Sequence, residues 1–128
     1  MQYFNGIAFW VSEVSTAAIH DGTTSTYLIG EKSLDVDRYD TWNGGGDAQS
    51  MYIGLDEDNV RWAAPALPMA RDRAGASNQM AFGGPHASGV QFVFCDGSVH
   101  AIHYTVDNTV HMQMANRADG AYPDPGDL

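Results

Sequence analysis

The chain has 128 residues and a formal net charge of −10, because six Lys and Arg residues stand against sixteen Asp and Glu residues. A chain of this length fits one domain, which we expect over residues 1–120, followed by an extended tail at residues 121–128. The negative charge repels polyanions, so we expect no nucleic acid and no anionic membrane surface as a partner, whereas divalent cations or a basic protein surface fit the charge.

The N-terminal part of the chain predicts one clear strand. Residues 1–15 mix aromatic and polar types, which indicates a strand or an irregular edge. Asp21-Gly22 is a turn signal, and the Thr, Tyr, Leu and Ile residues that follow it favour a strand. A glycine inside a strand indicates a close backbone approach or a bulge, and we expect one of these at Gly30.

Residues 33–61 are acidic and rich in glycine, with Gly44-Gly45-Gly46 at their centre. A long loop of this kind in a small domain is usually functional or mobile. Within it, residues 48–53 favour a short helical turn or a strand. Pro65 and Pro68 then exclude a long helix between residues 61 and 74.

The most legible unit is a hairpin over residues 89–104. Two strand-like runs flank Asp96-Gly97, which as a two-residue type I′ turn needs positive φ at both positions. That turn would place one face in the core, formed by Val90, Phe92, Phe94, Val99 and Ala101. The other face would carry Gln91, Val93, Cys95, Ser98 and His100. Cys95 is the single cysteine, so no internal disulfide is possible and we expect a buried thiol.

A short helix is expected after the hairpin. Asp107 is a helix cap, and the helix would run from about Asn108 to Ala118 and stop at Gly120. Val110, Met114 and Ala118 would form its apolar stripe against the sheet. The expected fold class is therefore α+β, with an antiparallel sheet, a C-terminal hairpin, long loops and a short C-terminal helix.

The order of motifs resembles a known family. Phe82-Gly83-Gly84-Pro85-His86, nine further residues and then Asp96-Gly97-Ser98-Val99 resemble the His-x9-Asp-Gly signature of the DUF1559 proteins, which carry a prepilin-type N-terminal segment. Residues 19–32, the pattern Met51-Tyr52-x-Gly54-x-Asp56, Arg61-Trp62 and the close at residues 116–120 are similar to further blocks of that family. The resemblance covers roughly residues 16–120.

The resemblance implies a pseudopilin-like head with an antiparallel sheet in a periplasmic or cell-surface protein. The family's full-length form begins with a hydrophobic helix that is processed like a prepilin, and this chain departs from that pattern because it lacks such a helix. Since no apolar run reaches the roughly 18 residues needed to cross a bilayer, we expect no membrane contact for this chain. The resemblance carries no catalytic residues.

The acidic loop is the best candidate for a metal site. Ca²⁺ takes six to eight oxygen ligands, which Asp47, Asp56, Asp58 and Asn59 could supply together with carbonyls of the glycine loop. Heads of type II secretion pseudopilins hold Ca²⁺ in a loop, which supports this by analogy only. A merely solvated loop is the alternative. The spacing from Asp56 excludes an EF-hand.

Other chemistries stay open. His86 with Asp96 could form a metal site or a catalytic dyad, or His86 could bond the backbone beside the hairpin while Asp96 makes the turn. A metal site from three of the five histidines, His20, His86, His100, His103 and His111, also stays open. A glycan hydrolase would use His86, Asp56 and Asp58. A carbohydrate- or protein-binding module would use Trp42, Trp62 and the glycine loop.

The reading that we favour is a structural head domain of a surface or secretion-associated protein, with Ca²⁺ as its one expected cofactor. Its partners would be proteins of the cell envelope or further copies of the same chain. If the chain is an enzyme, we expect a hydrolase.

Overall fold

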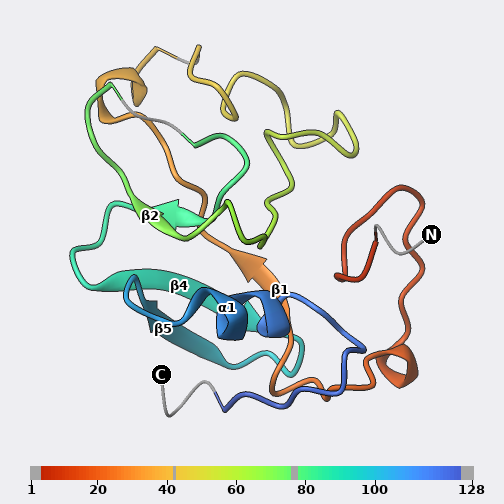
Figure 1. The fold of residues 1–128 in the computed structure, drawn as a ribbon. Coiled ribbons are helices and arrows are strands. Elements are labelled where there is room, and N and C mark those ends of the chain that lie inside the picture. The colour runs from red at the N-terminus through yellow and green to blue at the C-terminus, as the bar shows by residue number, and fades with distance from the viewer. Residues whose placement is uncertain (1–3, 42, 76–77, 125–128) are drawn as a thin grey trace.

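The computed structural model describes residues 4–41, 43–75 and 78–124 (Figure 1). In these residues a three-stranded antiparallel sheet has the order β1-β4-β5, and two short strands, β2 and β3, form a parallel pair. The elements follow the chain as the 3₁₀ turn Thr16–Ala18, β1 (Tyr27–Gly30), the 3₁₀ turn Val36–Arg38, β2 (Ala70–Arg71), β3 (Gly83–Gly84), β4 (Gly89–Phe94), β5 (Val99–His103) and α1 (Asn108–Met114). The expected α+β class, with its antiparallel sheet and short C-terminal helix, is confirmed.

The hairpin is present, but its predicted register is wrong by one residue. Phe92 lies opposite His100 and Val93 opposite Val99, and the turn closes through a bond of 2.9 Å from the Gly97 N–H to the Phe94 carbonyl. Gly97 alone takes a positive φ, of 88°, in this turn. This geometry fits a three-residue loop, a type I turn followed by a left-handed glycine, in place of the two-residue type I′ turn.

The shifted register exchanges the two faces of β5. Ile102 is fully buried, whereas Val99 is 63% exposed and Ala101 is also exposed. Val90, Phe92 and Phe94 of β4 are buried as predicted. A slip of one residue moves every side chain of a strand to the opposite face, so a correct face on β4 did not secure a correct face on β5.

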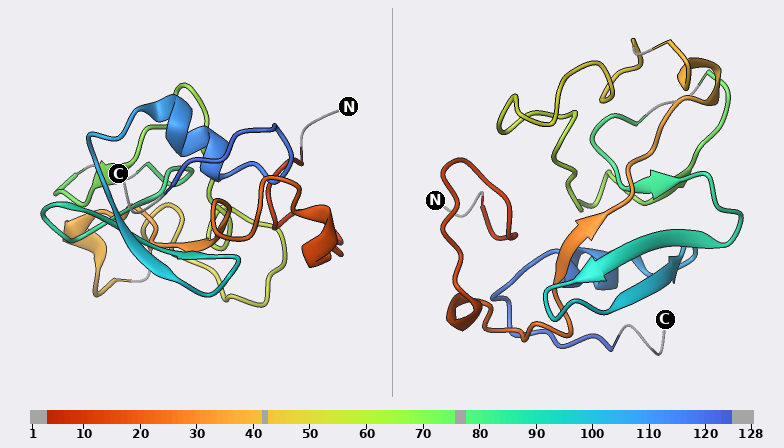
Figure 2. Two further views of the ribbon diagram at one scale, coloured as in Figure 1. Left: turned by 90° about the horizontal axis from the view of Figure 1, so that it is seen from below. Right: turned by 180° about the vertical axis from the view of Figure 1, so that it is seen from behind.

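The core lies between the sheet and α1, which covers one face of the sheet (Figure 2). Tyr27 stacks on Phe92 with ring centroids 3.9 Å apart, and Met114 from α1 is fully buried in the same cluster. Burying aromatic rings and a thioether in contact removes a large apolar area from water, which is what fixes the helix on the sheet.

Gly30 shows both features that its position predicts. A Cβ at Gly30 would lie 2.4 Å from the Phe92 ring, so the backbone of β1 approaches that ring too closely for any side chain. The pairing with β4 also shifts between Tyr27 and Ile29, which marks a bulge. The turn at Gly22 is present as well, with a φ of 88°.

The C-terminal helix begins where it is predicted and ends earlier. The Asp107 side chain accepts from the Thr109 N–H, as a capping residue does, and this bond holds the pKa of Asp107 below its usual value. The helix ends at Met114, not at Ala118, so Ala118 takes no part in the apolar stripe. In its place, His111 is buried beside Met114.

The rest of the described chain is mainly irregular. Residues 4–15 contain no strand, residues 48–53 form turns, and the described residues between 61 and 74 contain no helix, as the two prolines predict. The acidic loop lies at the end of the molecule away from the β4–β5 hairpin (Figure 1). Within the described part, none of the helices is long and apolar enough to cross a membrane.

Candidate functional site

His86 of the signature pairs with Glu31, not with Asp96. Its Nε2 lies 3.0 Å from Glu31 Oε1, and the other oxygen of Glu31 accepts from the Gln91 N–H at 2.7 Å. Glu31 directly follows β1, whereas His86 precedes β4. The pair therefore ties together two segments that are 55 residues apart in the sequence.

Asp96 lies beyond the opposite end of β4, within the hairpin loop. Its Oδ1 accepts from the Ser98 N–H at 2.8 Å and from the Ser98 hydroxyl at 2.7 Å. The bond from the Ser98 hydroxyl, with help from the Ser98 N–H, holds the pKa of Asp96 below its usual value. Because the length of β4 separates His86 from Asp96, the two signature residues do not form a dyad.

Ser98 stands between Asp96 and His100. The Ser98 Oγ lies 3.1 Å from His100 Nε2 and donates its proton to Asp96. His100 is then the donor to Ser98, which is the reverse of the transfer that a nucleophilic serine requires. The arrangement is a short hydrogen-bond chain that braces the hairpin loop.

The acidic loop is organised around an internal cation, Lys32. Its ammonium donates to the Gly46 carbonyl at 3.0 Å and to the Asp58 carbonyl at 3.4 Å, and it forms an ion pair with the Asp47 carboxylate. Carbonyl and carboxylate oxygens around one positive charge resemble the surroundings of a hard metal ion. Lys32 therefore occupies the place among these oxygens that a Ca²⁺ ion would need.

Arg61 is the second cation beneath the loop. Its guanidinium donates to the Gly46 carbonyl at 3.0 Å, to the Val60 carbonyl at 3.1 Å and to the Glu57 carbonyl. Only 9% of the residue is exposed, and burial lowers the pKa of Arg61. Lys32 and Arg61 thus share the Gly46 carbonyl and hold the glycine-rich turn on the body of the domain.

The predicted calcium ligands are partly brought together. Asp58 accepts from the Ala48 N–H at 3.1 Å, and Asp56 accepts from the Asp58 N–H at 3.0 Å. The side-chain amide of Asn59 points elsewhere, because its nitrogen donates to the carbonyls of Met51 and Gly54. In the residues that the structure describes, no three His, Cys, Asp or Glu side chains gather as metal ligands do. Calcium binding stays a prediction.

His111 is a residue whose environment the sequence did not reveal. It is fully buried, its Nδ1 lies 3.3 Å from the Tyr27 hydroxyl, and its Nε2 has no partner among the described residues. The rings of Phe82 and Phe92 lie against it. Burial lowers the pKa of His111 to about 4, so the ring is neutral at pH 7. Its spacing of three residues from Met114 on a helix was the available signal.

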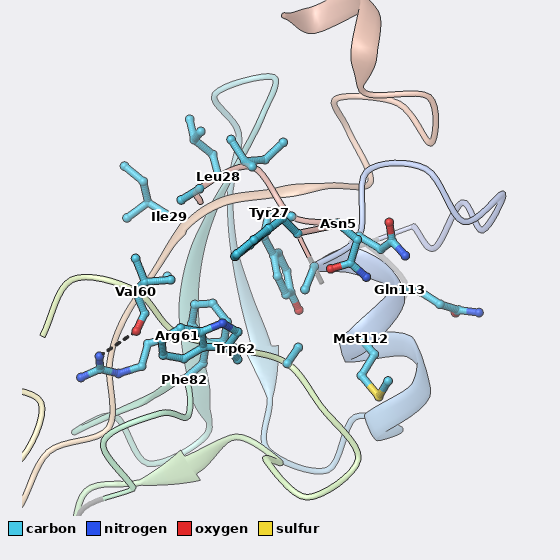
Figure 3. A pocket seen from close by; sticks show the side chains of 18 of the residues that line it. Asn5, Tyr27, Leu28, Ile29, Val60, Arg61, Trp62, Phe82, Met112 and Gln113 are labelled. Atoms are coloured by element: carbon cyan, nitrogen blue, oxygen red, sulfur yellow. Dashed lines mark hydrogen bonds between the residues drawn. The ribbon is translucent and has the colours of Figure 1, made fainter. Parts of the chain in front are cut away.

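The main pocket of the domain opens between β1 and α1 (Figure 3). It has a volume of about 610 Å³, and Tyr27 points into it between Trp62 on one side and Met112 on the other. Asn5 and Gln113 bring two amide side chains to the same space. Trp62 therefore faces a pocket, as a binding module requires, whereas the second predicted tryptophan, Trp42, lies outside the described residues.

Sequence comparison adds the family and nothing finer. Neither the curated proteins nor the solved structures include a match to this chain. The family model described as "Protein of unknown function (DUF1559)" matches residues 1–109, which is most of the chain. The residues that tie β1 to β4 and close the hairpin are those that carried the resemblance, and this chain belongs to the DUF1559 family.

Proposed function

We propose that this chain is a structural head domain of a pseudopilin-like, extracytoplasmic protein associated with the cell surface or with secretion. It acts through contacts with other envelope proteins or with copies of itself. The observation that carries the proposal is the use of the signature residues: His86 binds Glu31, and Asp96 binds Ser98. Each is engaged in holding strands together, which suits a scaffold.

The contacts of the acidic residues also support a scaffold over a hydrolase. The hydrolase alternative needs His86, Asp56 and Asp58 to act on one substrate. Asp56 and Asp58 accept backbone N–H groups of the acidic loop, whereas His86 binds Glu31 beside β4. A pair of catalytic carboxylates requires free oxygens facing a common substrate, and these side chains stabilise two separate turns.

Location in the cell tests the proposal directly. We expect the protein to be found in the envelope fraction of cells that express the native gene, and to be degraded when protease is added to intact cells or to spheroplasts. A cytoplasmic protein assayed on the same blots serves as the control. Recovery of the chain with that control, protected until the cells are lysed, would rule out an extracytoplasmic head.

Calcium binding by the acidic loop is proposed as a second property of the head. Because Lys32 already neutralises the oxygens of Gly46, Asp47 and Asp58, removal of its charge should strengthen the binding of Ca²⁺. We expect millimolar Ca²⁺ to raise the melting temperature of Lys32→Met by about 3 °C or more, and that of the native chain by less.

Differential scanning fluorimetry with Ca²⁺, Mg²⁺ and chelator measures this effect. Arg38→Met is the matched control, since Arg38 is also cationic but binds Asp35 and Asn43 at a different turn. If neither the native chain nor Lys32→Met responds to Ca²⁺, the calcium proposal is wrong. An equal response in all three proteins would place the ion away from Lys32.

A further inference from the structure

β1 is an edge strand whose open side faces the pocket. In the described sheet β1 pairs only with β4, and all four of its residues line the pocket. Leu28 is 45% exposed and Ile29 is 62% exposed, although both are large and apolar. An uncovered edge with apolar side chains is the usual acceptor for an added strand.

The far walls of the pocket suit an inserted side chain. Trp62, Phe82 and Met112 line its floor together with Tyr27, so an aromatic or branched side chain would lose water there and gain apolar contact (Figure 3). The volume of about 610 Å³ exceeds what one side chain fills. It therefore has room for a length of extended backbone that carries such a side chain.

The charges at the two ends of β1 differ in sign. Lys32 and Arg61 line the pocket beyond Gly30, where β1 ends. Asp119 lines it at the other end, since the Asp119 N–H binds the Asp21 carboxylate in the turn that precedes β1. An occupant that runs along β1 would meet positive charge at one end and negative charge at the other.

We propose that the open edge of β1 binds an extended peptide segment of a partner protein by strand addition, with one aromatic or branched side chain in the pocket. The described neighbours β4 and β5 are antiparallel, and antiparallel pairing is slightly the more stable. In that direction the segment begins beside Lys32 and ends beside Asp119. Its sequence is therefore acidic, apolar, aromatic, apolar, basic.

A second copy of this chain is a weaker occupant than another protein. Each chain carries a net charge of −10, so two copies repel each other at close range. The inference names the kind of partner that the head binds, and it rests on the proposed function in that the head acts through protein contacts. Peptide binding and cellular location are separate measurements, so either can fail alone.

Two peptides of identical composition test the direction of charge. Acetyl-Glu-Val-Phe-Val-Lys-amide should bind with a Kd below about 1 mM, and about fivefold more tightly than acetyl-Lys-Val-Phe-Val-Glu-amide. Titration calorimetry gives both constants, and amide shifts of β1 and α1 locate the site. In Asp119→Asn the preference between the two peptides should fall, because one of the two charged contacts is removed.

N-methylation of the peptide tests strand addition itself. Successive amides of a strand point in opposite directions, so methylation of one central amide should weaken binding about tenfold and methylation of the next should change it little. Ile29→Lys should also abolish binding, whereas Val99→Lys, at a position with nearly the same exposure on β5, should not. No binding by either peptide, or equal effects of the two methyl groups, would overturn the proposal.

Discussion

Acidification from pH 6.5 to about pH 4 is expected to destabilise the fold by about 3 kcal/mol through His111 alone. His111 takes up its proton near pH 6.5 in the unfolded chain and near pH 4 in the folded one. Between these values the unfolded state binds more protons, so the free energy of unfolding falls as the pH falls. The contribution of neutral His111 is complete above pH 6.5 and lost below about pH 4.

The cause of this shift is the surroundings of the ring. The groups that face His111 are the Tyr27 hydroxyl and the rings of Phe82 and Phe92, and none of them is a carboxylate that could stabilise a positive charge. Protonation therefore places an uncompensated charge in the core. Burial also raises the pKa of Tyr27, so the tyrosine stays neutral throughout this range.

Urea unfolding at several pH values between 7 and 4 measures the effect. In His111→Phe the fall in stability across this window should shrink by about 3 kcal/mol, because the titrating group is gone and the aromatic cluster is kept. His103→Gln is the control, since His103 is exposed on β5 and should leave the slope unchanged. NMR titration of His111 in the native chain gives the same pKa independently; a value near 6.5 would contradict the prediction.

The fold was predictable where local chemistry decides it. Asp107 begins the helix through its side chain, and Gly30 marks a close approach, because each of these depends on a few neighbouring atoms. The hairpin register was not predictable from Asp96-Gly97 alone. A two-residue and a three-residue loop both place a glycine with positive φ after an aspartate, and they differ in which residues of the strands face the core.

The candidate site was less predictable because distant residues build it. The acidic segment drew attention as a metal site through its carboxylates. Lys32 lies 15 residues before Asp47 and 26 before Asp58, and nothing in that spacing indicates that its ammonium lies among their oxygens. The pairing of Glu31 with His86 spans 55 residues in the same way. Neither contact follows from periodicity or from turn chemistry.

Gly83→Ala is expected to destabilise the domain by an amount on the order of 3 kcal/mol, because β3 has no space for a Cβ. A Cβ at Gly83 would lie 2.0 Å from the Ala70 carbonyl oxygen and 2.7 Å from the Ser33 Cβ. The first of these is backbone of the paired strand β2, so the two strands would have to separate. A rotamer change cannot relieve such a contact.

Gly44→Ala is the matched control for Gly83→Ala. Neither glycine has a positive φ, and a Cβ at Gly44 would lie 3.6 Å from Arg38, at an ordinary contact distance. An alanine there limits the unfolded chain, so we expect unchanged or slightly raised stability. Urea unfolding compares the two variants with the native chain, and a loss below about 0.5 kcal/mol in Gly83→Ala would show that β2 and β3 can part at little cost.

The same substitution should also reach the signature histidine. The Gly83 N–H donates to the Glu31 carbonyl at 3.1 Å, so movement of β3 displaces the residue that binds His86. We therefore expect the NMR signals of His86 to shift in Gly83→Ala and to stay unchanged in Gly44→Ala. That result would tie the glycine and the histidine of the signature to one structural purpose, the placement of Glu31 between β1 and β4.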